Sequence, residues 1–338
     1  MRRIFGVIAV CLVLVMGVYR LQIRGEKEMS VHEPHMTTHC IGRSIIGLPD
    51  GFRRAPIVSG IFKSADSKVQ DPSFDVIVIE NGFTKSSFSQ AIDKRRSDLK
   101  ENSDGTVDVF ESEKVASDGA VIFRIRRIDD AHVSEINFLR GSSLVTVKLD
   151  SFRDEYVAAE ERLTKFASAF MEAQDDSSRR YPQHFCLGSV SIAGDFKDES
   201  ASFLFKNSEG ADFEAEINTY IPDAGKPLLT RASGPDSLLA VFNVDYKILR
   251  SGERDVVNMR AQEWLGSAKL SGQDEGKSLK FVLETIRKKP GKSAPSINLT
   301  FNTGKPLPGG GNAKTTISDD EAVQIWDKVV DSIRPAMP

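Results

Sequence analysis

The sequence predicts an α+β fold of two similar domains, each a mainly antiparallel sheet with packed helices. Two segments about half a chain apart share the pattern cysteine, aliphatic residue, glycine and polar residue, at Cys40–Arg43 and Cys186–Ser189. Short alternating runs follow one another in each half with few helices between them, which favours antiparallel sheets. An amphipathic helix closes each half. We interpret the chain as a tandem duplication; the alternative is a chance match between two short segments.

Length and composition are those of a globular protein of about two domains. The chain has 338 residues, of which 40% are hydrophobic and 28% charged, and either half is long enough to bury a core. The net charge of −3 and the lack of a dominant basic stripe give no indication of a nucleic-acid partner. We place the domains at residues 36–174 and 184–335, with the polar stretch 175–183 as their linker.

Residues 1–25 are typical of an export segment. Met1–Arg3 supply positive charge, and Ile4–Tyr19 contains no charged residue, as in a secretory signal peptide. Cleavage after Gly17 and retention as a membrane anchor both fit, although the apolar run is shorter than the ~20 residues that a spanning helix prefers. A helix buried in the fold is a third possibility. Lipidation of Cys11 is excluded, because Val10 stands where a lipoprotein signal needs a small residue.

Cys40 and Cys186 are the two cysteines that follow this segment. An even pair in an exported protein suggests a disulfide, which would join the two halves. In the chain-entropy model so long a loop stabilises the fold by on the order of 5 kcal/mol. The alternative is two separate buried thiols, and it is slightly favoured, because each cysteine also has a packing role in its repeated segment.

The first half is predicted to form a strand, a helix, a four-stranded meander and a closing helix. The strand spans residues 74–80 and the polar helix 83–99, with Phe88 and Ile92 as its apolar residues. The closing helix is predicted over 154–173, with acidic residues at its start, where the helix dipole favours them. The meander consists of alternating runs broken by Asp/Gly turns, at 107–113, 120–126, 132–139 and 144–149.

The second half is predicted to repeat this organisation. Ser318 and Glu321 form a capping-box pattern at the start of a closing helix over 319–333. Residues 304–314 form a Pro/Gly-rich loop, which lacks the phosphate-binding pattern because Lys314 follows an alanine. Alternating runs lie at 201–206, 212–220, 241–250, 255–265, 278–287 and 297–302.

The sequence carries no pattern of catalytic residues, so we predict a protein that is not an enzyme and has no cofactor. A Gly-x-Ser-x-Gly elbow is absent, and Gly141–Ser143 looks like a turn between two strands. Catalysis by serine and histidine would need a well-held histidine. The five histidines are His32, His35, His39, His132 and His184.

The remaining candidates have simpler interpretations. A zinc site would need the early histidines, His184 and the two cysteines to converge, and Pro34 prevents a helical ligand arrangement, so we predict no metal. The carboxylate pairs and the tryptophans fit solvated helix faces, helix starts and core anchors. They are Glu160–Glu161, Asp319–Asp320, Trp264 and Trp326.

Several segments resemble the immunity proteins of type VI secretion lipase effectors, specifically the family paired with the class-four lipase effector. Residues 38–43 and 46–49 are similar to the start of its N-terminal domain, and Phe185–Gly188 to the opening of its C-terminal domain. Arg250–Arg254, Ala261–Glu263, 295–304 and the tail 326–335 resemble later stretches. The resemblance spans about residues 38–335. Asn258–Arg260 and the glycine-rich 304–314 depart from the family pattern.

The resemblance implies a periplasmic protein, soluble or anchored to the inner membrane by residues 4–19, whose two domains lie around a cleft like a claw. Its partner would be a cognate lipase toxin, a phospholipase that it binds and inhibits to protect the producing cell. The effector-binding residues are unknown from the sequence, although exposed strand-connecting loops and 304–314 are candidates. An envelope structural or assembly protein is the alternative, and an enzyme is the third possibility.

Overall fold

In the computed structural model of the protein, the described residues from Met36 onward form one compact unit. The predicted signal or anchor (1–25), the linker (175–183) and 305–314 lie outside the described residues. None of the described helices is long and apolar enough to cross a membrane. The structure describes residues 35–68, 71–101, 108–116, 118–173, 184–220, 225–233, 246–270, 276–286, 291–304, 315 and 317–336.

One antiparallel sheet runs through both halves of the sequence. In spatial order it consists of β15 (Tyr246–Val256), β16 (Met259–Leu270), β17 (Gly276–Thr285), β18 (Ser296–Asn302), β14 (Asp212–Asn218), β13 (Phe196–Lys206), β4 (Ile57–Ser64), β5 (Phe74–Ile79), β9 (Ser143–Phe152), β8 (Ala131–Arg140), β7 (Val121–Ile128) and β6 (Val109–Val115). The short β3 (Arg53–Arg54) also pairs with β13. The halves join where β4 pairs with β13. A mostly antiparallel sheet with few helices is confirmed, whereas the division into two domains around a cleft stays a prediction.

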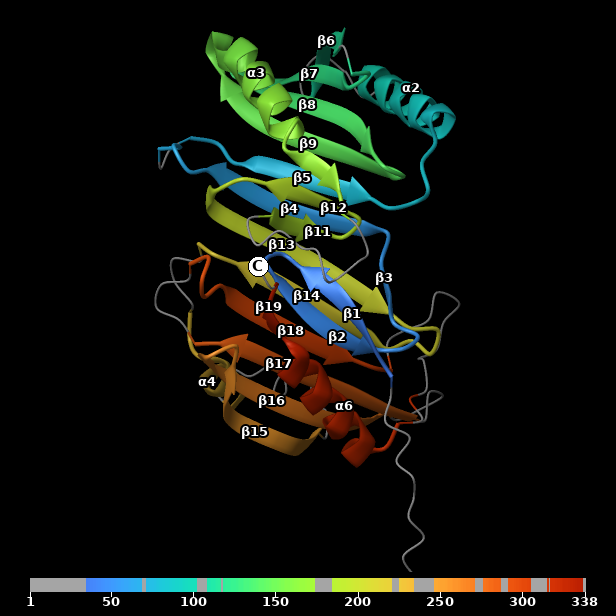
Figure 1. Cartoon of the computed structure of the whole chain (residues 1–338), viewed down its shortest axis with the longest axis vertical. Helices are drawn as coiled ribbons and strands as arrows, with labels where there is room; N and C mark the ends of the chain where they lie inside the picture. The colour runs from blue at the N-terminus through green and yellow to red at the C-terminus, as the bar shows by residue number, and fades with distance from the viewer. Residues whose placement is uncertain are drawn as a thin grey trace, which may run out of the picture. The chain divides into compact units, whose positions relative to one another are not determined.

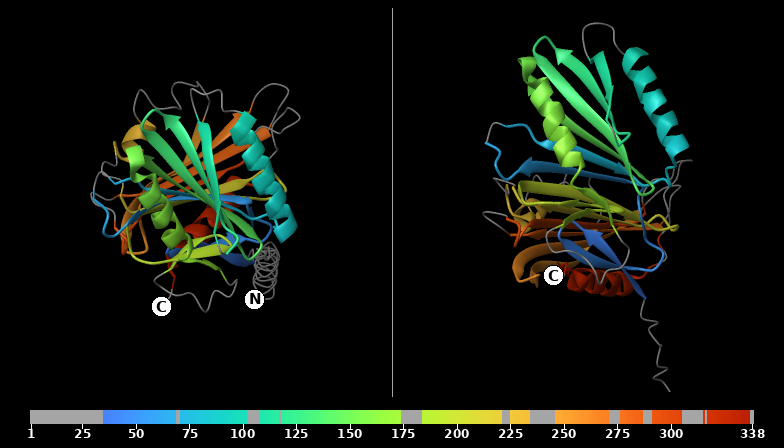
Figure 2. Two further views of the ribbon diagram at one scale, coloured as in Figure 1. Left: turned by 90° about the horizontal axis from the view of Figure 1, so that it is seen from above. Right: turned by 45° about the horizontal axis from the view of Figure 1, so that its top comes forward.

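The strands of the first half form the predicted meander, β9–β8–β7–β6. Helix α2 (Lys85–Glu101) and helix α3 (Tyr156–Ala167) cover opposite faces of it (Figure 2). Alternation in β7 explains this, because Phe123 packs with α2 while Arg124 pairs with Glu160 of α3.

The predicted closing helix, over 154–173, begins about where expected but ends earlier. A 3₁₀ turn, η1 (Arg153–Glu155), precedes α3, and the chain leaves the helix after Ala167. Residues 170–172 form strand β10 (Phe170–Glu172), in which Phe170 pairs with Ile192. Helical periodicity in the sequence cannot show that residues 170–172 pair with another strand. This tertiary pairing overrides the helical preference of the segment.

The second half contains the six predicted strands, but several bounds differ: the strand predicted at 201–206 begins at Phe196, and the hairpin of β15 and β16 is shifted along the sequence. A break was expected between residues 250 and 255, yet β15 runs through it, with Gly252 opposite Glu263. The turn falls at Val257–Asn258, where φ is 51° and 61°. Two successive positive φ values are the geometry of a tight two-residue hairpin turn. Apart from glycine, asparagine is the residue that tolerates a positive φ best. Residues 241–245, also assigned to this strand, lie outside the described residues.

Two small sheets and helix α6 (Asp319–Ser332) lie in front of the large sheet (Figure 1). One consists of β1 (Met36–Ile41), β2 (Ser44–Pro49) and β19 (Arg334–Pro335), and the other of β10, β12 (Val190–Ala193) and β11 (His184–Leu187). Helix α6 begins as predicted, because the Ser318 side chain accepts a hydrogen bond from the Glu321 backbone N–H. A short helix that was not predicted, α4 (Leu228–Ser233), contacts β16.

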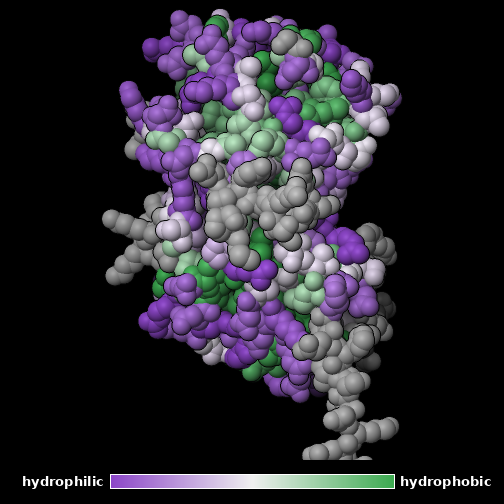
Figure 3. Space-filling model, in the orientation of Figure 1, coloured by the Kyte–Doolittle hydropathy of each residue, from purple (hydrophilic) through white to green (hydrophobic). Residues whose placement is uncertain are grey.

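The front layer and the sheet share one large hydrophobic core. Trp326 is completely buried and packs edge-on against Phe281, and Trp264 is 5% exposed, so both tryptophans are core residues as expected. Phe74 and Phe166 stack with their ring centroids 4.2 Å apart. On the face seen in Figure 3, hydrophobic residues reach the surface only in separate areas between hydrophilic ones.

Candidate functional site

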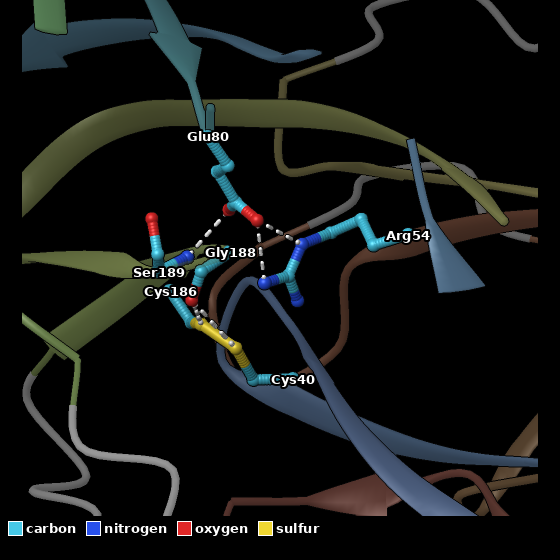
Figure 4. Close-up of a disulfide and its surroundings, with 6 residues drawn as sticks. All are labelled: Cys40, Arg54, Glu80, Cys186, Gly188 and Ser189. Atoms are coloured by element: carbon cyan, nitrogen blue, oxygen red, sulfur yellow. Dashed lines mark hydrogen bonds and ion pairs between the residues drawn. A yellow bond between two sulfur atoms is a disulfide. The ribbon is translucent and has the colours of Figure 1, made fainter. Parts of the chain in front are cut away.

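The repeated Cys-x-Gly segments are two β-hairpins that meet each other. Their turns contain Gly42 and Gly188, with φ of +61° and +73°, a left-handed backbone that glycine adopts without steric cost. Gly42 and Cys186 exchange two backbone hydrogen bonds of 3.2 and 2.9 Å. The structure joins Cys40 to Cys186 by a disulfide, with the Cα atoms 6.1 Å apart (Figure 4). We call this region the hairpin junction.

In the first hairpin the residue after glycine is held by a buried carboxylate. Arg43 Nε donates to Glu199 Oε2 at 2.9 Å, and Arg43 Nη2 donates to the Gly194 carbonyl at 3.0 Å. The Glu199 side chain is completely buried and that of Arg43 is 17% exposed. Burial and the positive charge of Arg43 lower the pKa of His184 below its usual value.

In the second hairpin the carboxylate binds the backbone instead. Glu80 Oε1 accepts a hydrogen bond of 2.6 Å from the Ser189 N–H, and Glu80 Oε2 accepts two from Arg54, of 3.0 and 3.2 Å (Figure 4). The Ser189 hydroxyl lies 2.6 Å from that of Ser143. These contacts hold the two hairpins of the junction together, and each of its carboxylates binds an arginine.

The Arg-x-Gly-x-Arg stretch and Glu263 belong to a second ionic cluster, between β15, β16 and α6. Arg250 Nη1 donates to Asp327 Oδ2 at 2.9 Å, and Arg254 Nη1 donates to Asp327 Oδ1 at 2.7 Å and to Glu263 Oε2 at 3.2 Å. Trp326 Nε1 donates to the same Glu263 oxygen at 3.0 Å. Burial opposes ionisation of Asp327, but the hydrogen bonds from the two arginines lower its pKa overall. This motif therefore fixes α6 on the sheet.

The predicted catalytic and metal candidates do not converge on a reactive site. His39, His132 and His184 lie on β1, β8 and β11, His35 precedes β1, and His32 lies outside the described residues. Among the described side chains, no group of three or more metal-binding residues comes together. The carboxylate of Glu160, expected on a solvated face, is buried and paired with Arg124. Asp319 does lie at a helix start, where Lys277 lowers its pKa to about 2.

Among the described residues, the side chains around His132 most resemble a catalytic arrangement. Its Nε2 lies 3.4 Å from a Glu111 carboxylate oxygen, and its strand neighbours on the same face are Ser134 and Ser151. These serines are 0% and 4% exposed, so a substrate cannot reach their hydroxyl groups. Three surface grooves, with volumes of about 190, 410 and 320 Å³, have no histidine among their lining residues.

One strand-connecting turn presents large apolar side chains to solvent. Ile128 and Phe152 are 64% and 60% exposed, and both are paired with Ala131, so the three form one row across β7, β8 and β9. Helix α2 covers Ile125 and Val133 on the same face and leaves this row uncovered. We call residues 128–130 and 152–155, all exposed, the tip surface. Its apolar residues could not be recognised in the sequence, because a bulge between Arg126 and Ile128 changes which face Ile128 occupies.

The fold is that of the type VI secretion immunity proteins. The chain superposes on "apo structure of immunity protein TplEi of T6SS from Pseudomonas aeruginosa" with a TM-score of 0.65 and 19% identity, covering 89% of this chain and 97% of that one. It superposes on a chain of "the crystal structure of Tle4-Tli4 complex" with a TM-score of 0.64, 19% identity and the same coverages. No curated protein matches the sequence.

Residues 183–336 match the family described as Tle cognate immunity protein 4 C-terminal domain. The resemblance of the second half of the chain to this family is thereby confirmed. A further TplEi structure, complexed with an "L" peptide, is similar with a TM-score of 0.61 at 19% identity, covering 89% of this chain and 98% of that one.

Proposed function

We propose that the protein is a periplasmic immunity protein, which binds a cognate type VI secretion phospholipase and inhibits it without catalysing a reaction. The observation that carries this proposal is the match of residues 183–336 to the Tle cognate immunity protein 4 domain. A fold shared over 89% of this protein with a chain of the Tle4-Tli4 complex supports it. The toxin is therefore expected to be a lipase of the Tle4 kind.

Action by binding is supported by the ionic groups of the described residues. Glu199, Glu263 and Glu135 are the most buried carboxylates of the ionic clusters, and each is paired with arginine. Such groups are neutralised by fixed partners and are poor candidates for proton transfer. A location in the periplasm is supported by the export segment at residues 1–25 and by the disulfide, which persists in oxidising compartments.

Co-expression with the product of the adjacent gene, which the proposal expects to be a lipase, tests this proposal. We expect the full chain, exported to the periplasm, to co-purify with that lipase in a stoichiometric complex and to abolish its hydrolysis of phospholipid vesicles. The lipase alone and the lipase with an unrelated periplasmic protein are the controls. A fully active lipase that forms no complex would instead favour an envelope structural or assembly role, and the family match would then describe the fold only.

A further inference from the structure

We propose that three buried polar side chains of the first half, those of His132, Ser134 and Ser151, bind one internal water molecule between the sheet and helix α3. This inference goes beyond the proposed function and does not depend on it. Within the part of the chain that the structure describes, neither the imidazole Nδ1 nor the two hydroxyl oxygens have a hydrogen-bond partner. A buried polar atom without a partner is costly, and an ordered water molecule is a common partner for such atoms.

The register of the sheet brings the three side chains together. His132 and Ser151 are paired across β8 and β9, and Ser134 lies two residues along β8 from His132, so all three are on one face of the sheet. Paired residues have their Cβ atoms about 5 Å apart, and diagonal neighbours about 7 Å. A water molecule that makes two hydrogen bonds of about 2.8 Å joins atoms up to roughly 5.6 Å apart. One water molecule can therefore reach all three polar atoms.

Helix α3 covers this face of the sheet (Figure 2). The Tyr156 ring of α3 lies edge-on to the His132 ring, with the ring centroids 5.2 Å apart, and Ala159 of the same helix is buried. None of the three proposed water ligands is more than 8% exposed, so bulk solvent does not reach them. A site for a single water molecule needs polar partners and short side chains around it, and two serines and Ala159 supply the short side chains here.

The charges around these residues favour a neutral ligand. The neighbouring positions on β7 are Arg124 and Arg126. Arg124 Nη2 donates to Glu160 Oε1 at 2.6 Å. Arg126 Nε lies 3.3 Å from a Glu111 carboxylate oxygen. Because each arginine is already paired with a carboxylate, neither an anion nor a cation gains an opposite charge here, whereas a water molecule needs none.

The hydrogen-bonding capacity of water then determines which nitrogen of His132 carries the proton. The hydroxyl groups of Ser134 and Ser151 donate to the water, and the water donates to His132 Nδ1, which makes the three hydrogen bonds typical of a buried water molecule. The neutral imidazole therefore carries its proton on Nε2, which lies 3.4 Å from a Glu111 carboxylate oxygen. The water thus orients His132 toward the edge strand β6, on which Glu111 lies.

Magnetic relaxation dispersion of isotopically labelled water counts the long-lived internal water molecules of a protein in solution. We expect the double variant Ser134→Ala/Ser151→Ala to hold one internal water fewer than the wild-type chain. Ser143→Ala is the matched control, because this serine of β9 is equally buried but its hydroxyl lies 2.6 Å from that of Ser189. The control should keep the wild-type count. An equal count in the wild type and the double variant would overturn the proposal.

Thermal unfolding and nitrogen NMR give two further readouts. Removal of a hydroxyl that binds water loses a hydrogen bond, whereas removal of an unpartnered buried hydroxyl relieves a penalty. Ser134→Ala should therefore lower the melting temperature by about 3 °C, and an unchanged or raised melting temperature would contradict the bound water. In alkaline buffer, the NMR signals of His132 in the wild-type chain should show a proton on Nε2 and none on Nδ1. A proton on Nδ1 would overturn the assigned hydrogen bonds.

Discussion

Hairpins β1–β2 and β11–β12 start from the same sequence pattern and turn at glycines with the same left-handed backbone, yet they bind their carboxylates differently. The first uses the guanidinium of Arg43, which contacts a Glu199 that is completely buried. The second uses the backbone N–H of Ser189, and Glu80 receives its charge partner from Arg54 on β3. The repeated residues thus determine the backbone of the turn, whereas the residue after each glycine determines whether a side chain or a backbone N–H binds the carboxylate.

This difference has an energetic consequence. The ion pair of the first hairpin is more deeply buried than that of the second, in which Arg54 and Glu80 are each 17% exposed. Removal of one partner from a buried pair leaves an uncompensated charge in a medium of low dielectric constant, whereas water compensates a partly exposed charge. The two hairpins should therefore differ in their sensitivity to loss of the arginine, which leaves Glu199 completely buried but Glu80 partly exposed, although their backbones are alike.

The largest expected effect comes from the disulfide, which acts on both hairpins at once. It closes a loop with a sequence separation of 146, so its loss should lower the free energy of unfolding by about 5 kcal/mol. Urea unfolding of the wild type with and without reductant, and of Cys40→Ala/Cys186→Ala, measures this. Titration of free thiols in denatured, unreduced protein is the control, and two free thiols besides Cys11 would contradict the bond.

The second effect separates the two hairpins. Arg43→Gln should lower the free energy of unfolding by about 3 kcal/mol, because the completely buried Glu199 is left without its charge partner. Arg54→Gln should cost only about 1 kcal/mol, because water reaches Glu80, which is 17% exposed and keeps its hydrogen bond from the Ser189 N–H. Both variants are compared by urea unfolding in oxidised protein. Equal losses would show that the depth of burial does not distinguish the two ion pairs.

The sequence predicts the local elements of this fold well where one strand follows another. The meander from β6 to β9, the capping box of α6 and the turn at Gly141–Ser142 follow from alternation and turn chemistry, which act over a few residues. The second-half strands also follow, except where β15 continues through Gly252. In a sequence, a glycine inside a strand looks like the end of that strand, because only pairing with the neighbouring strand keeps the glycine extended.

Long-range features could not be derived in this way. Pairing of β4 with β13 joins the halves into one sheet. The contacts of Glu199 with the first hairpin and of Glu80 with the second depend on this pairing. Both carboxylates lie far from their hairpins in sequence and belong to no motif. The tip surface was missed for a related reason, because the exposure of Phe152 depends on where α2 ends above the sheet. Pattern reasoning did identify strand-connecting turns as the class of residues to inspect.

The smallest of these effects tests the turns themselves. At Gly188 an added Cβ would collide with the Glu80 carboxylate, which Arg54 and Ser189 hold in place, whereas at Gly42 it would meet the edge of the Phe185 ring at 3.0 Å. Both positions also require a positive φ. We expect Gly188→Ala to cost about 2 kcal/mol and Gly42→Ala about 1 kcal/mol, measured by urea unfolding. In Gly188→Ala/Glu80→Ala the collision is gone, so the double variant should lose less than the sum of its single variants. Simple additivity would mean that the φ angle alone, common to both hairpins, sets the cost.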